Sequence, residues 1–257
     1  MTNHFQKFKE LHDQQEPLLI GNVWNVQSAK KMEDLGFKAL GTSSYAIAET
    51  LGYADGEEMS FEEYLFITKR IAAAVSTPLS VDLEAGYGKT VAEIVANIKE
   101  LNKIGVSGIN IEDSVVEQGE RTIVEAESFA QKIKAVAQEL SKEDINIFIN
   151  LRSDVFLLAL PDALAEAKRR ISIYETIGVH GLFFPCVTKI EDIEALTQAT
   201  KLPINVMCMP DLPDFNKLQN ADVKRISMGN FLNNKIYQYL GSEVETVLKN
   251  KNFSSVF

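Results

Sequence analysis

Residues 91–113 read VAEIVANIKELNKIGVSGINIED, and this stretch carries the pattern that decides the fold. Residues 91–104 space their apolar side chains along one face of a helix. Gly105 follows, and glycine commonly ends a helix because it adopts the left-handed backbone conformation without strain. Segment 108–113 is short and mainly apolar, as expected of a parallel strand that is covered on both faces. The stretch therefore predicts a helix followed directly by a strand of a parallel sheet.

Units of this kind run along the whole chain. The form helix, Gly, two residues, Gly or Ala, strand recurs at Gly36 and Gly178. The predicted strands are residues 18–25, 37–44, 79–84, 108–113, 146–152, 181–186, 203–208 and 225–229. The predicted helices are residues 26–35, 61–75, 91–104, 125–140, 163–177, 190–199 and 231–248, and the weakest is 212–219, where Pro213 and Asn216 interrupt the pattern.

The number and spacing of these units predict the fold class. Eight units within about 230 residues favour a closed (β/α)8 TIM barrel over an open sheet. No glycine-rich dinucleotide fingerprint follows the first strand, which disfavours the open sheet further. We therefore predict an α/β protein with a single (β/α)8 barrel domain over residues 1–257, a short polar N-terminal segment and a C-terminal helix. His4 and His12 lie in the polar segment and are expected to be exposed.

Composition and charge exclude several classes of protein. The chain is 46% hydrophobic and carries a formal net charge of −10, which disfavours a nucleic-acid partner. Its two cysteines, Cys186 and Cys208, are too few for a disulfide framework and are expected to be small buried side chains. No signal-peptide pattern is present, and no apolar run approaches the roughly 20 residues of a membrane span. We expect a cytoplasmic protein without a membrane partner.

Carboxylates gather where the predicted strands end. Asp82 and Glu84 end the third strand on one face, Glu112 ends the fourth, and Asp55 lies in the loop after the second. In a barrel of this kind the active site lies at the carboxyl ends of the strands. Converging carboxylates repel one another unless they are protonated or neutralised, and ligands made only of oxygen favour Mg²⁺ or Mn²⁺. The alternative is that these acids cap helices or form ion pairs around the rim.

Four motifs resemble one known superfamily in their order and spacing. They are VDLEAGYG at 81–88, NIED at 110–113, NLRSD at 150–154, and GTSSY at 41–45 followed by LGYAD at 51–55. Together they resemble the isocitrate lyase/phosphoenolpyruvate mutase superfamily, including its carboxyvinyl-carboxyphosphonate phosphorylmutase-like members. The resemblance extends from Gly21 to about Gly229 and implies a TIM barrel that binds Mg²⁺ or Mn²⁺.

The resemblance also implies roles for individual residues. Asp82 would bind the metal directly, and Glu84, Glu112 and Asp55 would hold its water shell, although the family usually carries Asp where Glu84 stands. Ser43, Ser44 and Tyr45 would bind a substrate carboxylate, partly through backbone N–H groups, and Arg152 would be a second, bidentate clamp. Asp55, Glu112 and Arg152 are the predicted catalytic residues. Family members are commonly tetramers that exchange the eighth helix, so a homo-oligomer, dimer or tetramer, is expected.

The implied reaction is lyase chemistry on a small α-keto or 2-hydroxy (di)carboxylate through an enolate. Mg²⁺ would stabilise the enolate during either C–C bond cleavage or formation, or P–C bond cleavage or rearrangement in a phosphonate, and both occur in the superfamily. The loop after the fourth strand, SVVEQGERTI at 114–123, lacks the family's Lys or Cys. Arg121 is its only cation, and its pKa is too high for ordinary acid catalysis. A keto-acid-binding protein that has lost catalysis is therefore the third alternative.

Overall fold

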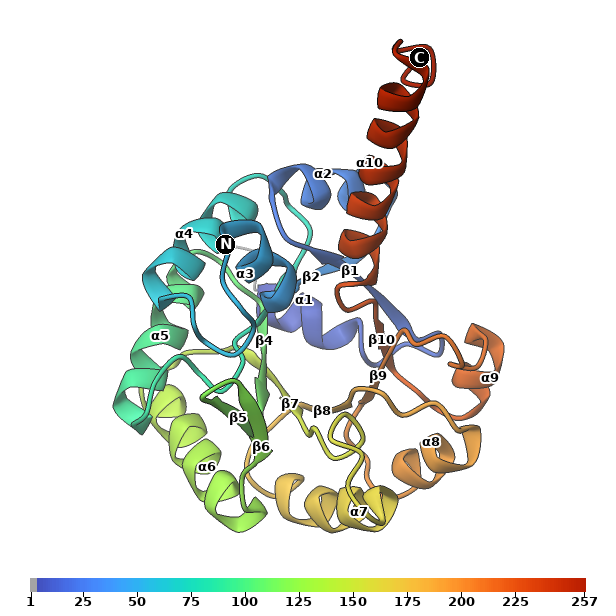
Figure 1. The fold of residues 1–257 in the computed structure, drawn as a ribbon. Helices are drawn as coiled ribbons and strands as arrows, with labels where there is room; N and C mark the ends of the chain where they lie inside the picture. Colours follow the sequence, from blue (N-terminus) through green and yellow to red (C-terminus); the bar gives the residue numbers. More distant parts are fainter. Residues whose placement is uncertain (1–3) are drawn as a thin grey trace.

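The computed structural model describes residues 4–257 and contains a closed barrel of parallel strands surrounded by helices (Figure 1). The barrel order is β1-β2-β3-β4-β7-β8-β9-β10, with β10 pairing back onto β1. These strands are β1 (Leu18–Val23), β2 (Ala39–Thr42), β3 (Leu79–Asp82), β4 (Gly108–Glu112), β7 (Phe148–Arg152), β8 (Gly181–Phe184), β9 (Ile204–Met207) and β10 (Arg225–Ser227). The predicted (β/α)8 barrel is confirmed.

Helices connect the strands, and most of them cover the outside of the barrel, whereas the last helix extends away from it (Figure 1). They are α2 (Val26–Asp34), α3 (Ser44–Leu51), α4 (Phe61–Ala72), α5 (Val91–Lys103), α6 (Ala126–Lys142), α7 (Ala163–Tyr174), α8 (Ile190–Thr197), α9 (Phe215–Asn220) and α10 (Phe231–Asn250). Ser60 and Thr90 begin α4 and α5 with capping boxes, in which a hydroxyl and a glutamate exchange hydrogen bonds with the first backbone N–H groups. The apolar faces of these helices pack against buried strand residues such as Val81 and Ile109.

Glycine ends two helices in the way the sequence predicts. Gly105 has φ +87°, its N–H donates to Asn102 O at 3.0 Å, and the Val106 N–H donates to Leu101 O at 3.2 Å. Gly36 follows α2 in the same arrangement, with φ +84°. Gly178 also has positive φ, but α7 ends at Tyr174, so this glycine lies in the following turn rather than at the helix end.

Two further elements close the two ends of the barrel. At the carboxyl end of the strands, the segment after β4 forms an antiparallel hairpin of β5 (Ser114–Glu117) and β6 (Glu120–Ile123), which the sequence did not predict. At the opposite end lies α1 (His4–Glu10), whose Phe8 is fully buried against strand residues including Phe148. Parallel strands bring all their carboxyl ends to one mouth, so the hairpin and the acidic residues meet there.

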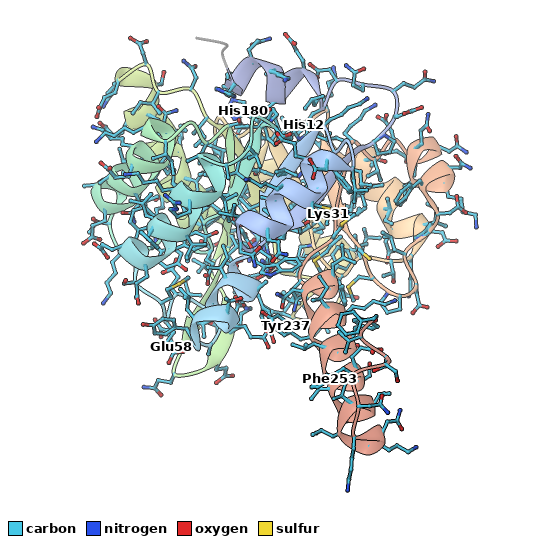
Figure 2. All side chains as sticks on the ribbon, turned by 90° about the horizontal axis from the view of Figure 1, so that it is seen from above. His12, Lys31, Glu58, His180, Tyr237 and Phe253 are labelled. Atoms are coloured by element: carbon cyan, nitrogen blue, oxygen red, sulfur yellow. The ribbon has the colours of Figure 1, made fainter. Side chains whose placement is uncertain are left out.

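The expectation that His12 is exposed was wrong. Its side chain is only 2% exposed and stacks on the Phe148 ring at 4.3 Å between centroids. Its Nδ1 lies 2.8 Å from Phe8 O, and because a carbonyl only accepts, Nδ1–H is the donor. Burial, together with the charge of Arg225, lowers the pKa of His12 to about 3. Figure 2 shows His12 and His180 at this end of the barrel.

The C-terminal helix α10 projects away from the barrel (Figures 1 and 2). It leaves large apolar side chains exposed, among them Ile236, Tyr237, Tyr239, Leu240 and Leu248. No helix within residues 4–257 is both long and apolar enough to cross a lipid bilayer.

The two cysteines differ from the expectation that they are buried. Cys186 is half-buried and Cys208 is exposed, and both lie just after strand ends.

Replacing Gly105 by Ala should lower the unfolding free energy by about 1 kcal/mol. A Cβ at this position meets no atom within 4 Å, so the cost comes from the left-handed backbone and not from a clash. Gly105→Asn is the matched control, because asparagine tolerates this conformation and should lose less. Urea unfolding measures both variants, and equal stability of the Ala and Asn variants would contradict this origin of the cost.

Replacing His12 by Phe should flatten the acid dependence of stability. The pKa of His12 is about 3 in the folded chain and about 6.5 unfolded, so its neutral form stabilises the fold fully above pH 6.5. That contribution is lost as the pH falls from 6.5 toward 3, at up to about 1.4 kcal/mol per pH unit. Unfolding free energies measured across this range should fall less steeply for His12→Phe than for wild type or for the exposed control His4→Gln. Parallel curves would refute the role of His12.

Candidate functional site

The mouth of the barrel contains a cavity of about 360 Å³ lined by both acids and arginines. Asp82, Asp55, Arg121, Arg152 and Arg225 all line it. They come from β3, the loop before α4, β6, β7 and β10, respectively, so five separate segments converge. Ser43 and Tyr45 line it from the beginning of α3. The structure therefore gathers Asp55, Asp82, Arg152, Ser43 and Tyr45 as the sequence predicts.

Asp82 is held rigidly by both of its backbone groups. Its N–H donates to Thr42 Oγ1 at 2.9 Å, and its carbonyl accepts from the Tyr64 hydroxyl at 2.7 Å. The hydroxyls of Thr42 and Tyr64 bond each other at 2.7 Å, which closes a small ring around the end of β3. Tyr64 is fully buried and its ring stacks on that of Tyr87. This network fixes the direction in which the Asp82 carboxylate points.

One oxygen of that carboxylate has no partner. Asp82 Oδ2 accepts from Ser44 Oγ at 2.9 Å, whereas Oδ1 is buried without a hydrogen bond. An unpartnered buried oxygen costs roughly 1–3 kcal/mol, and more when it is charged, so such an atom indicates a ligand. Ser44 thus contacts Asp82 through its side chain, and the predicted substrate contact is left to its backbone N–H.

Ser43 and Ser44 begin α3. Ser43 Oγ accepts the Ala46 N–H at 3.3 Å as the N-cap of the helix. The first N–H groups of a helix have no partner within it and favour an anion. The backbone of Ser44 and Tyr45 therefore presents donors at the cavity, which suits a carboxylate.

Glu84 does not share a face with Asp82, so that prediction was wrong. β3 ends at Asp82, and Glu84 has φ +49°, so the alternation of strand side chains stops before it. Its carboxylate accepts from the Glu57 N–H at 2.9 Å and from the Tyr87 hydroxyl at 2.8 Å. Burial, together with the charges of Asp55 and Glu112, raises the pKa of Glu84 to about 8.

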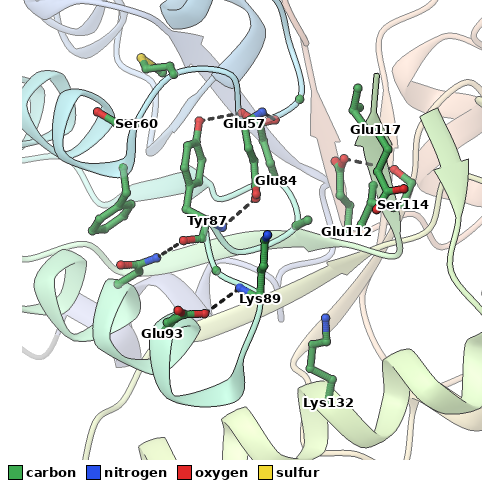
Figure 3. Close-up of a pocket in the computed structure, with 18 of the residues that line it drawn as sticks. Glu57, Ser60, Glu84, Tyr87, Lys89, Glu93, Glu112, Ser114, Glu117 and Lys132 are labelled. Atoms are coloured by element: carbon green, nitrogen blue, oxygen red, sulfur yellow. Dashed lines mark hydrogen bonds between the residues drawn. The ribbon is translucent and has the colours of Figure 1, made fainter. Parts of the chain in front are cut away.

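Glu84 lines a second, larger cavity of about 1160 Å³. This cavity lies between the hairpin and the segments that precede α4 and α5. Figure 3 shows Glu84 and Tyr87 on one side of this cavity and Glu112 and Ser114 on the other. Lys89 and Lys132 also line it. The acids predicted to surround one ion are therefore divided between two neighbouring cavities.

Glu112 lies between the two cavities and contacts two arginines. Its Oε2 is 2.9 Å from Arg152 Nη1, and its Oε1 accepts from Arg121. Burial raises the pKa of Glu112 to about 8, while the charges of Arg152 and Arg121 oppose that rise. Arg152 also donates from Nε to Asp154 Oδ1 at 2.6 Å. Glu112 and Asp154 thus hold Arg152, the predicted substrate-binding arginine. Only some of its guanidinium N–H groups remain for a ligand.

The sequence analysis missed a third arginine beneath the site. Arg225 begins β10, is 1% exposed, and has no hydrogen-bond partner for Nε or Nη1. Burial lowers the pKa of Arg225 to about 9, and the charge of Asp82 opposes this. The sequence signal that could have indicated Arg225 is its position as a charged residue at the beginning of a short barrel strand. Arg225 supplies positive charge below the Asp82 carboxylate.

A second buried ion pair supports the site from outside. Asp113 Oδ2 contacts Arg170 Nη1 at 2.8 Å, the Ser153 hydroxyl at 2.7 Å and the Tyr174 hydroxyl at 3.0 Å. Its Oδ1 accepts the Asp154 N–H at 3.0 Å. Asp113 thus bonds two side chains of α7 and two residues that directly follow β7. It therefore orients Asp154 and the end of β7.

No group of three or more His, Cys, Asp or Glu side chains in residues 4–257 is arranged to enclose a metal ion. Arg121 and Arg152 contact Asp55 and Glu112, and Glu84 bonds Glu57 and Tyr87 instead. A Mg²⁺ ion, however, usually keeps several waters and needs only one or two direct carboxylates. The free Oδ1 of Asp82 fits that mode of binding.

A barrel with acidic residues at its mouth is the architecture expected of the phosphoenolpyruvate mutase/isocitrate lyase superfamily of lyases and mutases. The family model of phosphoenolpyruvate phosphomutase matches residues 8–248, and the chain belongs to this family. The resemblance inferred from the four motifs is therefore confirmed.

Named relatives differ in their reactions. Oxaloacetate decarboxylase of Rhodopseudomonas palustris is 30% identical over 209 residues, which cover 79% of this chain and 70% of that protein. 2-Methylisocitrate lyase of Shewanella oneidensis is 27% identical over 219 residues, covering 83% and 72%. A Burkholderia cenocepacia J2315 structure, proposed to be a phosphonomutase, has 32% identity and a TM-score of 0.88, covering 95% of this chain and 100% of that chain.

Proposed function

We propose that this chain is a divalent-cation-dependent carbon–carbon lyase that decarboxylates a small β-keto dicarboxylate of the oxaloacetate class. The observation that carries the proposal is the Asp82 carboxylate, rigidly held at the cavity with Oδ1 buried and unpartnered. Arginines and the helix N-terminus at the same cavity suit a doubly negative substrate.

Asp82 would hold Mg²⁺ or Mn²⁺ directly, with Glu112, Asp55 and Glu84 reaching it through water. When bound, the cation supplies positive charge that stabilises the oxygen of the developing enolate. The orphaned Asp82 oxygen and the oxygen-only donor set support this assignment.

Other residues would hold the substrate. The N–H groups of Ser44 and Tyr45 at the beginning of α3 would bind the carboxylate next to the keto group. The donors of Arg152 that Asp154 and Glu112 do not use would bind the second carboxylate. Asp55, Glu112 and Arg152 are in this scheme the predicted catalytic residues, because each would contact the substrate or the water shell of the cation.

Decarboxylation suits a site whose loop lacks a lysine or cysteine. The bond between the leaving carboxylate and the carbon beside the keto group breaks, its electron pair forms the enolate, and carbon dioxide departs. A proton from water then returns to that carbon. No base is needed, whereas cleavage of a 2-hydroxy acid requires a base for the hydroxyl proton. The relative from Rhodopseudomonas palustris, named an oxaloacetate decarboxylase, supports the same choice.

P–C bond cleavage is the second candidate, favoured by the 32% identity to the Burkholderia cenocepacia protein that is proposed to be a phosphonomutase. Phosphate release from phosphonopyruvate would identify that reaction. A protein that binds keto acids without turnover is the third, and stabilisation by a keto acid and Mg²⁺ without any product would identify it.

Replacing Asp82 by Asn should lower turnover of oxaloacetate, followed as pyruvate in the presence of Mg²⁺, by more than about 100-fold. The substitution keeps the shape of the side chain and removes the charge that would bind the cation. Asp34→Asn, at the exposed end of α2, is the matched control. Mn²⁺ binding followed by electron paramagnetic resonance should weaken in parallel. Wild-type turnover by Asp82→Asn, or its wild-type affinity for Mn²⁺, would overturn the assignment.

We further propose that α10 packs against a second copy of this chain. Its exposed apolar residues and its projection from the barrel support this, since contiguous exposed apolar surfaces mark contact sites. Leu240→Glu should shift the mass measured by size exclusion with light scattering toward the monomer. Gln238→Glu adds the same charge to the same helix and is the control. A wild-type protein that is monomeric at micromolar concentration would refute the proposal.

A further inference from the structure

Arg121 extends from the hairpin into the mouth of the barrel. It lies on β6, opposite Val116 of β5, and it is the only Lys or Arg in residues 114–123. Its side chain is 16% exposed, so it is largely enclosed by the groups it contacts. Gln118 and Gly119 form the tip of the hairpin with φ +54° and +82°, as in a tight two-residue turn.

One guanidinium contacts three carboxylates from three separate segments. Arg121 Nη2 donates to Asp55 Oδ2 at 2.8 Å, and Nη1 donates to Glu112 Oε1 and lies 3.3 Å from Asp154 Oδ2. Nη1 also donates to Ser114 Oγ at 2.8 Å, which ties the two strands of the hairpin together at the same point. These contacts join the hairpin, the loop before α4 and the ends of β4 and β7.

Two of these acids, Asp55 and Glu112, are the ones proposed above to hold the water shell of the divalent cation. Asp55 Oδ2 and Glu112 Oε1 already accept charge-assisted bonds from Arg121, which weakens each carboxylate as an acceptor for metal-bound water. The guanidinium and the ion would also repel each other in the enclosed mouth, because both are positive. The two cations would therefore compete for the same two carboxylates.

We propose that Arg121 is a tethered counter-cation that competes with the divalent cation at Asp55 and Glu112. In the absence of the metal, Arg121 neutralises these acids and holds the hairpin against the barrel. Binding of the metal displaces Arg121 and loosens the hairpin from the loop before α4. The inference rests on the proposed metal site at Asp82. According to it, the hairpin of this chain controls the affinity of that site for the metal.

Direct Mn²⁺ binding, measured by electron paramagnetic resonance without substrate, tests the competition. Arg121→Gln should bind Mn²⁺ roughly 10-fold to 100-fold more tightly than wild type, the range in which groups around a metal's direct ligands change affinity. Arg121→Lys keeps the charge with a shorter reach and should fall between the two. Arg169→Gln is the matched control, since Arg169 pairs with Glu127 and Glu166 on the exposed outer surface.

The outcomes separate this inference from the proposed function. Equal or weaker Mn²⁺ binding by Arg121→Gln, with binding still lost in Asp82→Asn, overturns the competition and leaves the metal site intact. Absence of Mn²⁺ binding by both wild type and Arg121→Gln overturns the metal site and the inference together. Tighter binding by Arg121→Gln that Asp82→Asn does not abolish places the metal elsewhere and also overturns the inference.

Proteolysis of the hairpin tests whether metal binding releases Arg121. An arginine with a purely structural role would not make the cleavage rate depend on Mn²⁺. A glutamate-specific protease should cleave after the exposed Glu117 and Glu120 at the hairpin tip. Mn²⁺ should accelerate this cleavage in wild type, because it releases Arg121. Arg121→Gln should be cleaved rapidly with or without Mn²⁺. Cleavage of wild type that Mn²⁺ leaves unchanged or slows would overturn the release of the hairpin.

Discussion

Repulsion among converging carboxylates is the constraint on which the site depends. Parallel strands bring Asp82, Glu112 and Asp154 to one mouth of the barrel, and Asp55 joins them from a loop. Acids so close together cannot all be ionised without neighbouring positive charge. Three arginines supply this positive charge from different elements. Arg121 lies on the hairpin, Arg152 ends β7, and Arg225 begins β10, deeper in the barrel. The shape and chemistry of the mouth follow from this balance.

Among residues 4–257, the balance leaves Asp82 Oδ1 buried at the cavity with neither a hydrogen bond nor an ion pair. The other acids of the mouth accept bonds from arginines, hydroxyls or backbone N–H groups, whereas Asp82 Oδ1 accepts none. A cation with several waters and one direct protein ligand matches that arrangement better than a closed cage of carboxylates does. A substrate with two carboxylates would complete the neutralisation of the arginines. The chemistry proposed for this chain is therefore one in which charge, and not a side-chain base, drives the reaction.

The hairpin of residues 114–123 contains neither the lysine nor the cysteine that the family resemblance implies for this loop. In the sequence, Arg121 is the only cation of this loop, and its pKa is too high for ordinary acid catalysis. The structure adds that Arg121 is an ion-pairing residue, joined to Asp55 at 2.8 Å. The larger cavity beside the hairpin lies next to the same contact, because Glu112 lines it and bonds Arg121. Movement of the hairpin would therefore change both cavities at once.

The sequence by itself determined the barrel, the glycine ends of two helices, and the group of acids at the strand ends. These features follow from local periodicity and from the rule that parallel strands end on one side. Only the tertiary structure decided that Glu84 leaves the strand and bonds Glu57 and Tyr87, that His12 is buried, and that Arg121 reaches Asp55, 66 positions earlier in the chain. The physical reason is that pairing between distant charged groups depends on loop conformation and packing, which no local pattern of residues encodes.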